Sequence, residues 1–154
     1  MNRFFTAIAV VLLTTSAFSQ QNIIDSFQAG GVYRNFILHV PQGYNSANKY
    51  SLVLNLHGFT SNANTQMTNT KMNDLADTDA EPFFVVYPNG LNSSWEPLNT
   101  SSDDVSFLSA LIDTISARYT IDSTAVFSCG YSNGGITSYL LACQLSDKIA
   151  SIAS

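Results

Sequence analysis

The sequence is poor in charge, and above all in basic residues. Only 11% of its 154 residues are charged, and six Lys and Arg stand against eleven Asp and Glu, for a formal net charge of −5. The basic side chains are scattered and form no stripe, so we do not expect nucleic acid as a partner. The acidic balance favours solubility rather than any one mode of binding.

Long apolar runs are equally scarce, and the one that stands out lies at the start. Residues 4–13 form an apolar run, interrupted only by Thr6, that follows the short positive segment 1–3. Small residues come next, and among them Ala17-Phe18-Ser19 fits a cleavage site. This pattern predicts a secretory signal peptide over residues 1–19, removed near Ser19 and Gln20. A membrane anchor is the alternative, but the run is short for a bilayer span. We therefore expect residues 20–154 to be secreted, extracellular or periplasmic, with no membrane attachment after signal removal.

Cysteine is limited to Cys129 and Cys143. An exported protein can form disulfides. Cys129 ends a predicted strand and Cys143 lies about two helical turns beyond the following turn, a spacing that does not favour their pairing. Two interpretations stay open: Cys143 pairs with a cysteine outside this chain, or both are small buried side chains.

The rest of the sequence alternates strand patterns with helix patterns. The strands are expected at residues 32–40, 50–56, 83–87, 124–128 and 149–153, and the helices at 62–80, 105–119 and after residue 134. This alternation predicts an α/β fold with a mostly parallel sheet and helices on both faces. Residues 50–56 are nearly all apolar, as expected for a central strand covered on both faces. Ligands of such sheets lie beyond the carboxyl ends of the strands.

A Gly-x-Ser-x-Gly turn, Gly130 to Gly134, joins one of these strands to a helix. In this context the motif has the form of a nucleophile elbow, with Ser132 as the candidate nucleophile. An ordinary glycine-rich turn is the alternative. We expect Gly130 and Gly134 to lack side chains because they crowd the backbone of the serine. The N–H groups and the positive dipole end of the helix would then face a developing oxyanion.

A second turn, His57-Gly58-Phe59-Thr60, follows strand 50–56. Both turns follow parallel strands, so we expect them to meet at one edge of the sheet. His57 precedes a glycine at a strand end, and we interpret it as bracing the loop while the next backbone N–H groups bind the oxyanion. The alternative makes His57 the catalytic base. His39 lies within a strand and is interpreted as structural.

The catalytic machinery is incomplete within this sequence. A serine nucleophile needs a base, usually a histidine oriented by a carboxylate, and in this fold both follow the serine along the chain. After Ser132 the sequence offers only Asp147 and no histidine, and it stops within a strand pattern. We therefore expect residues 20–154 to be the N-terminal part of a longer hydrolase domain, truncated after the elbow helix.

Two further features have two interpretations each. Asp103 and Asp104 open a predicted helix, where capping and loop bracing are favoured over catalysis. Trp95, the only tryptophan, lies in a polar loop. Its ring either contacts substrate in a cleft or fills the core beneath the loop.

Five motifs occur together and in order, at residues 34–41, 56–58, 87–90, 103–107 and 130–135. Together they resemble the secreted α/β-hydrolases of the polyhydroxybutyrate depolymerase and feruloyl esterase type, carbohydrate esterase family one. The resemblance implies that Ser132 is the nucleophile and that the backbone N–H groups of Asn133 and of Phe59, or Thr60, form the oxyanion hole. It places the acid and the histidine beyond this chain, and implies that the cysteine on the elbow helix bridges to a later one. It requires no cofactor and no metal.

The expected function is therefore a secreted serine esterase that hydrolyses carboxylic esters. The expected substrates are feruloyl or acetyl esters of plant cell-wall polysaccharide, such as xylan. A polyester hydrolase that resembles polyhydroxybutyrate depolymerase is the first alternative. A hydrolase-like protein that binds glycan or polymer without turnover is the second, because the triad is incomplete.

Overall fold

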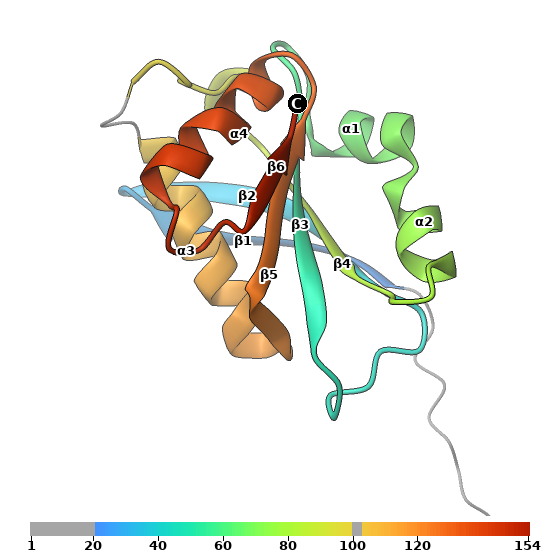
Figure 1. Cartoon of the computed structure of the whole chain (residues 1–154). Coiled ribbons are helices and arrows are strands. Elements are labelled where there is room, and N and C mark those ends of the chain that lie inside the picture. Colours follow the sequence, from blue (N-terminus) through green and yellow to red (C-terminus); the bar gives the residue numbers. More distant parts are fainter. Residues whose placement is uncertain (1–20, 100–102) are drawn as a thin grey trace, which may run out of the picture.

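The structure is a computed structural model that describes residues 21–99 and 103–154 (Figure 1). The predicted signal peptide, residues 1–19, lies outside the described residues. Within them, no helix combines the length and the apolar character needed to cross a bilayer.

One six-stranded sheet in the described residues organises the fold, in the order β1-β2-β4-β3-β5-β6. The strands are β1 Gln21–Ala29, β2 Val32–Val40, β3 Tyr50–Leu56, β4 Phe84–Pro88, β5 Ile121–Gly130 and β6 Ser151–Ala153. β3 pairs in parallel with β4 and with β5, and β5 with β6, whereas β1–β2 and β2–β4 are antiparallel. The predicted mostly parallel sheet is confirmed, and β3 lies near its middle as expected.

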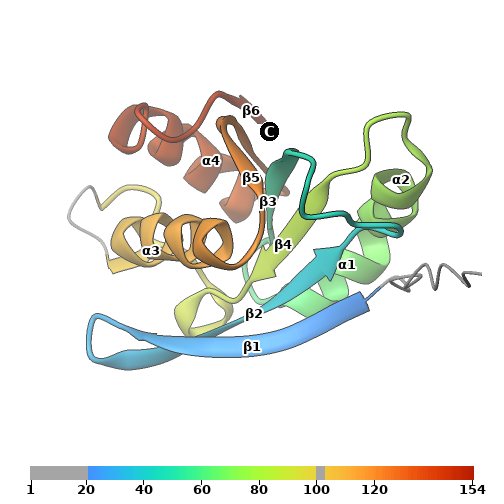
Figure 2. The ribbon, with the colours of Figure 1, turned by 90° about the horizontal axis from the view of Figure 1, so that it is seen from below.

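Helices cover both faces of this sheet, which confirms the second part of the prediction (Figure 2). α3 Asp103–Arg118 and α4 Asn133–Gln144 lie on one face, and α1 Ala63–Thr70 and α2 Met72–Thr78 lie on the other. The single helical region expected at 62–80 is broken in two, because Lys71 adopts a left-handed conformation with φ 49°. Asn62 caps α1, since its side chain accepts a hydrogen bond from the Thr65 N–H at 2.9 Å. A short 3-10 turn, η1 Leu91–Ser93, follows β4.

Strand β1 was not predicted from the sequence. It pairs with β2 along its whole length, from Gln21 opposite Val40 to Ala29 opposite Val32. The two strands are joined by Gly30 and Gly31, with φ values of 60° and 83°. Positive φ at both central residues is what a two-residue hairpin turn of type I′ requires.

The side chains of each strand alternate between the two faces of the sheet, and each face therefore has its own core. The two cores differ in size. The larger cluster lies under α3 and α4 and joins apolar residues of β2, β3 and β4 to Phe107, Leu108, Leu111 and Leu141. The smaller cluster lies under α1 and α2 and contains Ile37, Ala63, Ala76, Val85 and Tyr87. Full burial of each large apolar side chain contributes about 1.5–3 kcal/mol, so the first face supplies most of the stability.

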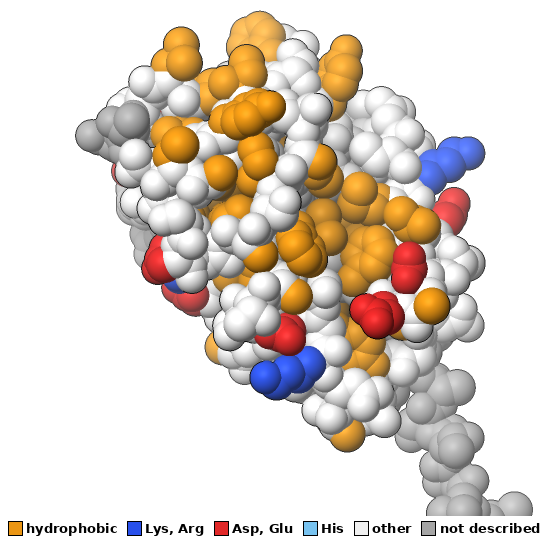
Figure 3. Space-filling model, viewed as in Figure 1, with side chains coloured by type: hydrophobic (Ala, Val, Ile, Leu, Met, Phe, Trp, Pro, Cys, Tyr) orange, Lys and Arg blue, Asp and Glu red, His pale blue; other side chains and the backbone are white. Residues whose placement is uncertain are grey.

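The face that carries α1 and α2 is not fully covered. A hollow of about 280 Å³ lies beside α2, lined mainly by apolar side chains that include Val53, Met72, Phe83, Phe127 and Ile152. Figure 3 shows hydrophobic side chains gathered across the middle of the molecule in this view. Val53 is only half-buried. The prediction that β3 is covered on both faces therefore holds for its carboxyl half alone.

Candidate active site

The elbow is a sharp turn between β5, which ends at Gly130, and α4, which begins at Asn133. Ser132 lies between them with φ 51° and ψ −115°, and it is exposed. A non-glycine residue in such a conformation costs about 1–3 kcal/mol, and surrounding contacts must hold it there. Two backbone bonds of the turn do so: Gly134 N–H donates to the Tyr131 carbonyl, and Ile136 N–H donates to the Ser132 carbonyl, both at 3.0 Å.

The two glycines of the elbow have no room for a side chain. A Cβ on Gly130 would lie 2.5 Å from the carbonyl carbon of Gly134, and one on Gly134 would lie 2.3 Å from the carbonyl oxygen of Leu56. The expected requirement for glycine is confirmed, but its expected reason was wrong. The side chain at position 134 is excluded by the end of the neighbouring strand β3, not by the backbone of the serine.

The turn after β3 and the elbow after β5 meet at the same edge of the sheet. Leu56 is paired with Gly130, and Tyr131 N–H donates to the Leu56 carbonyl at 3.2 Å. A Cβ on Gly58 would lie 3.0 Å from the Tyr131 ring, so the two turns are in contact. Phe59 and Tyr131 are 65% and 72% exposed, and they give this edge of the sheet exposed aromatic rings.

The two backbone N–H groups that we expected to bind the oxyanion have no hydrogen-bond acceptor within the residues that the structure describes. They belong to Phe59 and to Asn133, the first residue of α4, where a helix N–H has no partner within its own helix. The Thr60 N–H, named as an alternative to Phe59, donates to the Ser93 carbonyl at 2.8 Å. The Thr60 alternative is therefore wrong for this conformation, and Phe59 and Asn133 are left as the candidate donors.

His57 is fully buried and both of its ring nitrogens are engaged. Nδ1–H donates to the Gly58 carbonyl at 2.8 Å, and Nε2 accepts from the Gly90 N–H at 3.0 Å. These partners fix the tautomer, since a carbonyl only accepts and a backbone N–H only donates. Burial lowers the pKa of His57, against an opposing effect of the Gly58 hydrogen bond. A neutral ring with no free nitrogen is arranged to brace the loop rather than to take a proton from Ser132.

The Trp95 ring lies in the core. It is 2% exposed, its indole N–H donates to the His57 carbonyl at 2.9 Å, and its ring centroid is 5.0 Å from that of His57. The interpretation of Trp95 as a substrate contact is therefore wrong, and the alternative, that it fills the core beneath its loop, is correct. Its backbone faces Asn133, whose side chain accepts from the Trp95 N–H at 2.8 Å and donates to the Trp95 carbonyl at 3.2 Å.

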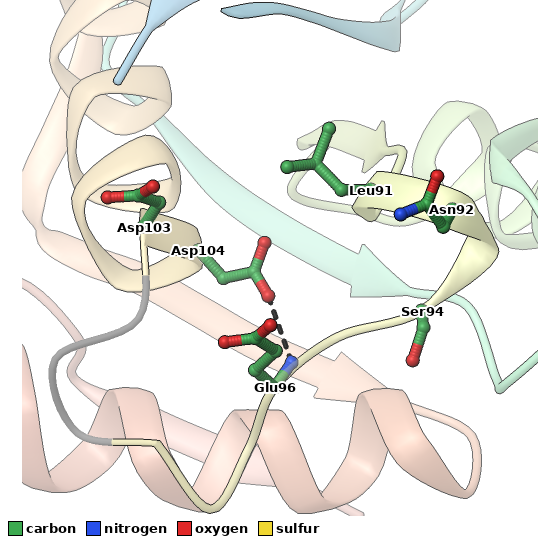
Figure 4. Close-up of a pocket in the computed structure, with 6 residues that line it drawn as sticks. All are labelled: Leu91, Asn92, Ser94, Glu96, Asp103 and Asp104. Atoms are coloured by element: carbon green, nitrogen blue, oxygen red, sulfur yellow. Dashed lines mark hydrogen bonds between the residues drawn. The ribbon is translucent and has the colours of Figure 1, made fainter. Parts of the chain in front are cut away.

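Of the two carboxylates that open α3, Asp104 bonds to a neighbouring strand and to the loop before the helix. Asp104 forms a buried ion pair of 2.6 Å with Arg34. It also accepts from the Glu96 N–H at 2.9 Å (Figure 4). A hollow of about 250 Å³ beside them is lined by Leu91, Asn92, Ser94, Glu96, Asp103 and Asp104 (Figure 4). Bracing rather than catalysis is thus the observed role of Asp104. In the described part of the chain, no three acidic, cysteine or histidine side chains converge in a manner suited to a metal ion.

Sequence reasoning missed Arg34. Its guanidinium lies 4.1 Å from the centre of the Phe107 ring, and its partner Asp104 is 70 residues away in the chain. Arg34 and Phe36 are two residues apart on β2, so both side chains point to the α3 face and both are buried. This spacing could have predicted from the sequence that Arg34 is buried.

Cys129 and Cys143 do not pair with each other, as their spacing indicated. Cys129 is half-buried, and burial raises its pKa to about 11. Cys143 is exposed on α4, so the interpretation of both as buried side chains is wrong for Cys143.

Comparison with known proteins places this arrangement in a family. The family model described as "Putative esterase" matches residues 28–154. The chain is 37% identical over 118 residues to a bifunctional acetylxylan esterase/xylanase of Neocallimastix patriciarum, covering 75% of this chain and 17% of that protein. It is 32% identical over 133 residues to feruloyl esterase D of Neurospora crassa, covering 80% of this chain and 45% of that protein.

Solved structures show the same fold. An acetyl xylan esterase from Aspergillus awamori superimposes with a TM-score of 0.72 at 18% identity, over 88% of this chain and 50% of that one. The chain thus spans less than two thirds of the length of the relatives named here. The family match extends from the β1–β2 hairpin through the elbow, and the fold is that of esterases of known structure. The chain belongs to the "Putative esterase" family.

Proposed function

We propose that this chain carries the nucleophile of a secreted serine esterase that hydrolyses carboxylic esters. The observation that carries the proposal is Ser132, exposed on a strained elbow at the start of α4, beside a second turn that offers the Phe59 N–H. A strained backbone at an exposed polar residue supports a functional site, since the strain has no benefit for stability.

In the proposed reaction, Ser132 Oγ attacks the carbonyl carbon of the ester while a base takes its proton. The carbonyl oxygen becomes an oxyanion that the Asn133 and Phe59 N–H groups stabilise. The C–O bond to the alcohol then breaks, the alcohol leaves with the proton, and water hydrolyses the acyl-enzyme. Each donor is expected to contribute about 100- to 1,000-fold in rate. The base and its acid are not assigned to any residue of this chain, because His57 has no free nitrogen and no histidine follows Ser132.

The proposed substrates are feruloyl or acetyl esters of plant cell-wall polysaccharide. The names of the relatives, acetylxylan esterase and feruloyl esterase, support this class. The exposed rings of Phe59 and Tyr131 support it independently, because they would stack on an aromatic acyl group. The same surface suits an apolar polyester, so the polyhydroxybutyrate depolymerase-like alternative is included in the test below.

Two proposals concern the organisation of the protein. Residues 1–19 are a signal peptide, and residues 20–154 form the N-terminal part of the hydrolase domain. N-terminal sequencing of the exported protein tests the first, since the mature chain should begin near Gln20. The mass of that mature protein tests the second: an active form that ends at Ser154 would contradict it.

The function is tested by Ser132→Ala in the protein expressed from its complete gene. Hydrolysis of p-nitrophenyl acetate, methyl ferulate and a hydroxybutyrate oligomer should fall by at least about 10⁴-fold, to the level of residual oxyanion-hole catalysis. A fluorophosphonate should label the unmodified protein and leave Ser132→Ala unlabelled. Undiminished turnover in Ser132→Ala would refute the assignment. An unlabelled, inactive but folded wild type would contradict the esterase and favour the alternative of a protein without turnover.

A further inference from the structure

Asn133 has two polar parts with different roles. Its backbone N–H is one of the two candidate oxyanion donors, whereas its side chain lies against the backbone of Trp95. The carboxamide accepts from the Trp95 N–H at 2.8 Å and donates to the Trp95 carbonyl at 3.2 Å. Only Asn and Gln offer a donor and an acceptor side by side on one planar group, so this reciprocal pair is specific to an amide side chain.

The same short segment also holds the second candidate donor. The Trp95 indole N–H donates to the carbonyl of His57, and the Ser93 carbonyl accepts from the N–H of Thr60. Phe59 lies between these two anchored residues. Segment 93–95 is therefore bonded on one side to the loop that carries the Phe59 N–H and on the other side to the residue that carries the Asn133 N–H.

The segment is itself fixed in place. The ring of Trp95 is buried in the main core cluster. A Cβ on Gly90 would lie 2.1 Å from the Ser94 carbonyl oxygen, so the chain packs closely where the segment turns. The Glu96 N–H that follows donates to the buried carboxylate of Asp104. A segment anchored by core packing and by a buried charge can act as a rigid spacer between two loops.

We infer that segment 93–95 sets the separation of the Phe59 and Asn133 N–H groups, and that the Asn133 carboxamide and the Trp95 indole are positioning residues of the oxyanion hole. The inference rests on the proposed function. Stabilisation of an oxyanion depends on donors held at about 2.7–3.1 Å from the position that the charged oxygen will occupy. A loose spacer would leave both N–H groups present but no longer at that distance from one oxygen.

Two variants test the spacer while both proposed donors stay in place. Asn133→Ala removes the two bonds to Trp95 and keeps the N–H of residue 133. Trp95→Phe removes the indole bond to His57 and keeps a ring in the core. Ser128→Ala is the matched control, because it removes a buried hydrogen bond of 2.9 Å to Ser138 that is not connected to segment 93–95. All are made in the protein expressed from its complete gene, beside Ser132→Ala.

The readouts are kcat and KM for p-nitrophenyl acetate, the inhibition constant of phenylboronic acid, and the thermal unfolding midpoint. Boron accepts the serine Oγ and becomes tetrahedral, so one boronate oxygen takes the place of the oxyanion. Asn133→Ala should lower kcat by about 10- to 100-fold and weaken boronate binding in proportion, with KM changed by less than about threefold. Trp95→Phe should act in the same direction by about tenfold. Ser128→Ala should lower the midpoint and leave kcat within about twofold of wild type.

The outcomes separate the spacer from the proposed function. If Ser132→Ala abolishes turnover but Asn133→Ala and Trp95→Phe keep wild-type kcat and boronate affinity, the spacer is refuted and the esterase stands. If the two variants lose activity only to the extent that they unfold, as measured against Ser128→Ala, the spacer is also refuted. If Ser132→Ala retains activity, the proposed function fails and the inference fails with it. Should Asn133→Ala not fold, Trp95→Phe alone decides.

Discussion

Removal of the charge of Asp104 should destabilise the protein far more than removal of a comparable charge from its surface. The Arg34 side chain is 1% exposed, and its guanidinium Nη2 lies 2.6 Å from the Asp104 carboxylate. Arg34 also contacts the Asn89 carbonyl at 3.4 Å and the face of the Phe107 ring. Its Nε has no hydrogen-bond partner among the described residues. Asp104→Asn would therefore leave a buried cation without a counter-charge.

The expected cost follows from that environment. Removal of one partner of a buried ion pair costs about 3–5 kcal/mol, because the other charge stays buried and unpaired. The cation–π contact with the Phe107 ring stabilises the guanidinium by only about 0.5–2 kcal/mol. Because this contact is already present in the wild type, it does not offset the loss of the carboxylate. Asparagine keeps an oxygen that can accept from the Glu96 N–H. We therefore expect Asp104→Asn to lower the free energy of unfolding by about 3 kcal/mol, the lower end of the range.

The measurement is urea unfolding of wild type, Asp104→Asn, Arg34→Met and the double variant. The double variant should be more stable than Asp104→Asn alone, since it no longer buries an unpaired charge. The control is Asp113→Asn, which removes an ion pair with Lys148 at a carboxylate that is 66% exposed. That pair should be worth less than about 1 kcal/mol. If Asp104→Asn lowers the free energy of unfolding no more than Asp113→Asn does, the buried charge does not dominate this site and the reasoning is refuted.

Three further predictions concern other parts of the molecule. Gly134→Ala should lower the free energy of unfolding by at least about 3 kcal/mol, because its Cβ would lie 2.3 Å from a carbonyl oxygen at the end of β3. Gly43→Ala is the control: it lies in open space at φ 76° and should lower the free energy by about 1 kcal/mol. Equal urea midpoints for the two variants would contradict this. Because burial lowers the pKa of His57, the unfolded chain takes up the proton first as the pH falls. Stability is thus retained above pH 6.5 and lost below it, by at most about 1.4 kcal/mol per pH unit, and His57→Asn should reduce this loss in unfolding measured at pH 7, 6 and 5. At pH 8 a disulfide reagent should modify Cys143 before Cys129. Cys129 is half-buried and has a pKa of about 11, so only roughly 0.1% of it is thiolate at that pH. Equal rates of modification would show that Cys129 is accessible and ionised.

The elbow could be predicted from the sequence because its information is local. Gly130 to Gly134 combine a backbone requirement with a strand before and a helix after, and all three signals lie within a short stretch. Strands β2 to β5 were predicted for a similar reason, since their buried faces give continuous or alternating apolar runs. The meeting of the two turns at one sheet edge then followed from the parallel pairing of β3 with β5.

What the sequence did not predict depends on contacts between distant residues. β1 is half exposed, and only alternate side chains such as Ile23 and Phe27 pack on the core, so its pattern was too weak to separate from a loop. The pairing of Arg34 with Asp104 joins residues that no local pattern relates. Trp95 had two interpretations in the sequence, and only the packing of its ring against His57 decided between them.

The conformation of Ser132 has a consequence for the stability of this protein. A backbone with φ 51° and ψ −115° suits glycine better than serine, so selection for thermal stability alone would remove the hydroxyl. Ser132→Gly is then a substitution that relieves strain while it deletes the proposed nucleophile. With serine at this position, the chain gives up a small part of its folding free energy and keeps one hydroxyl oxygen exposed.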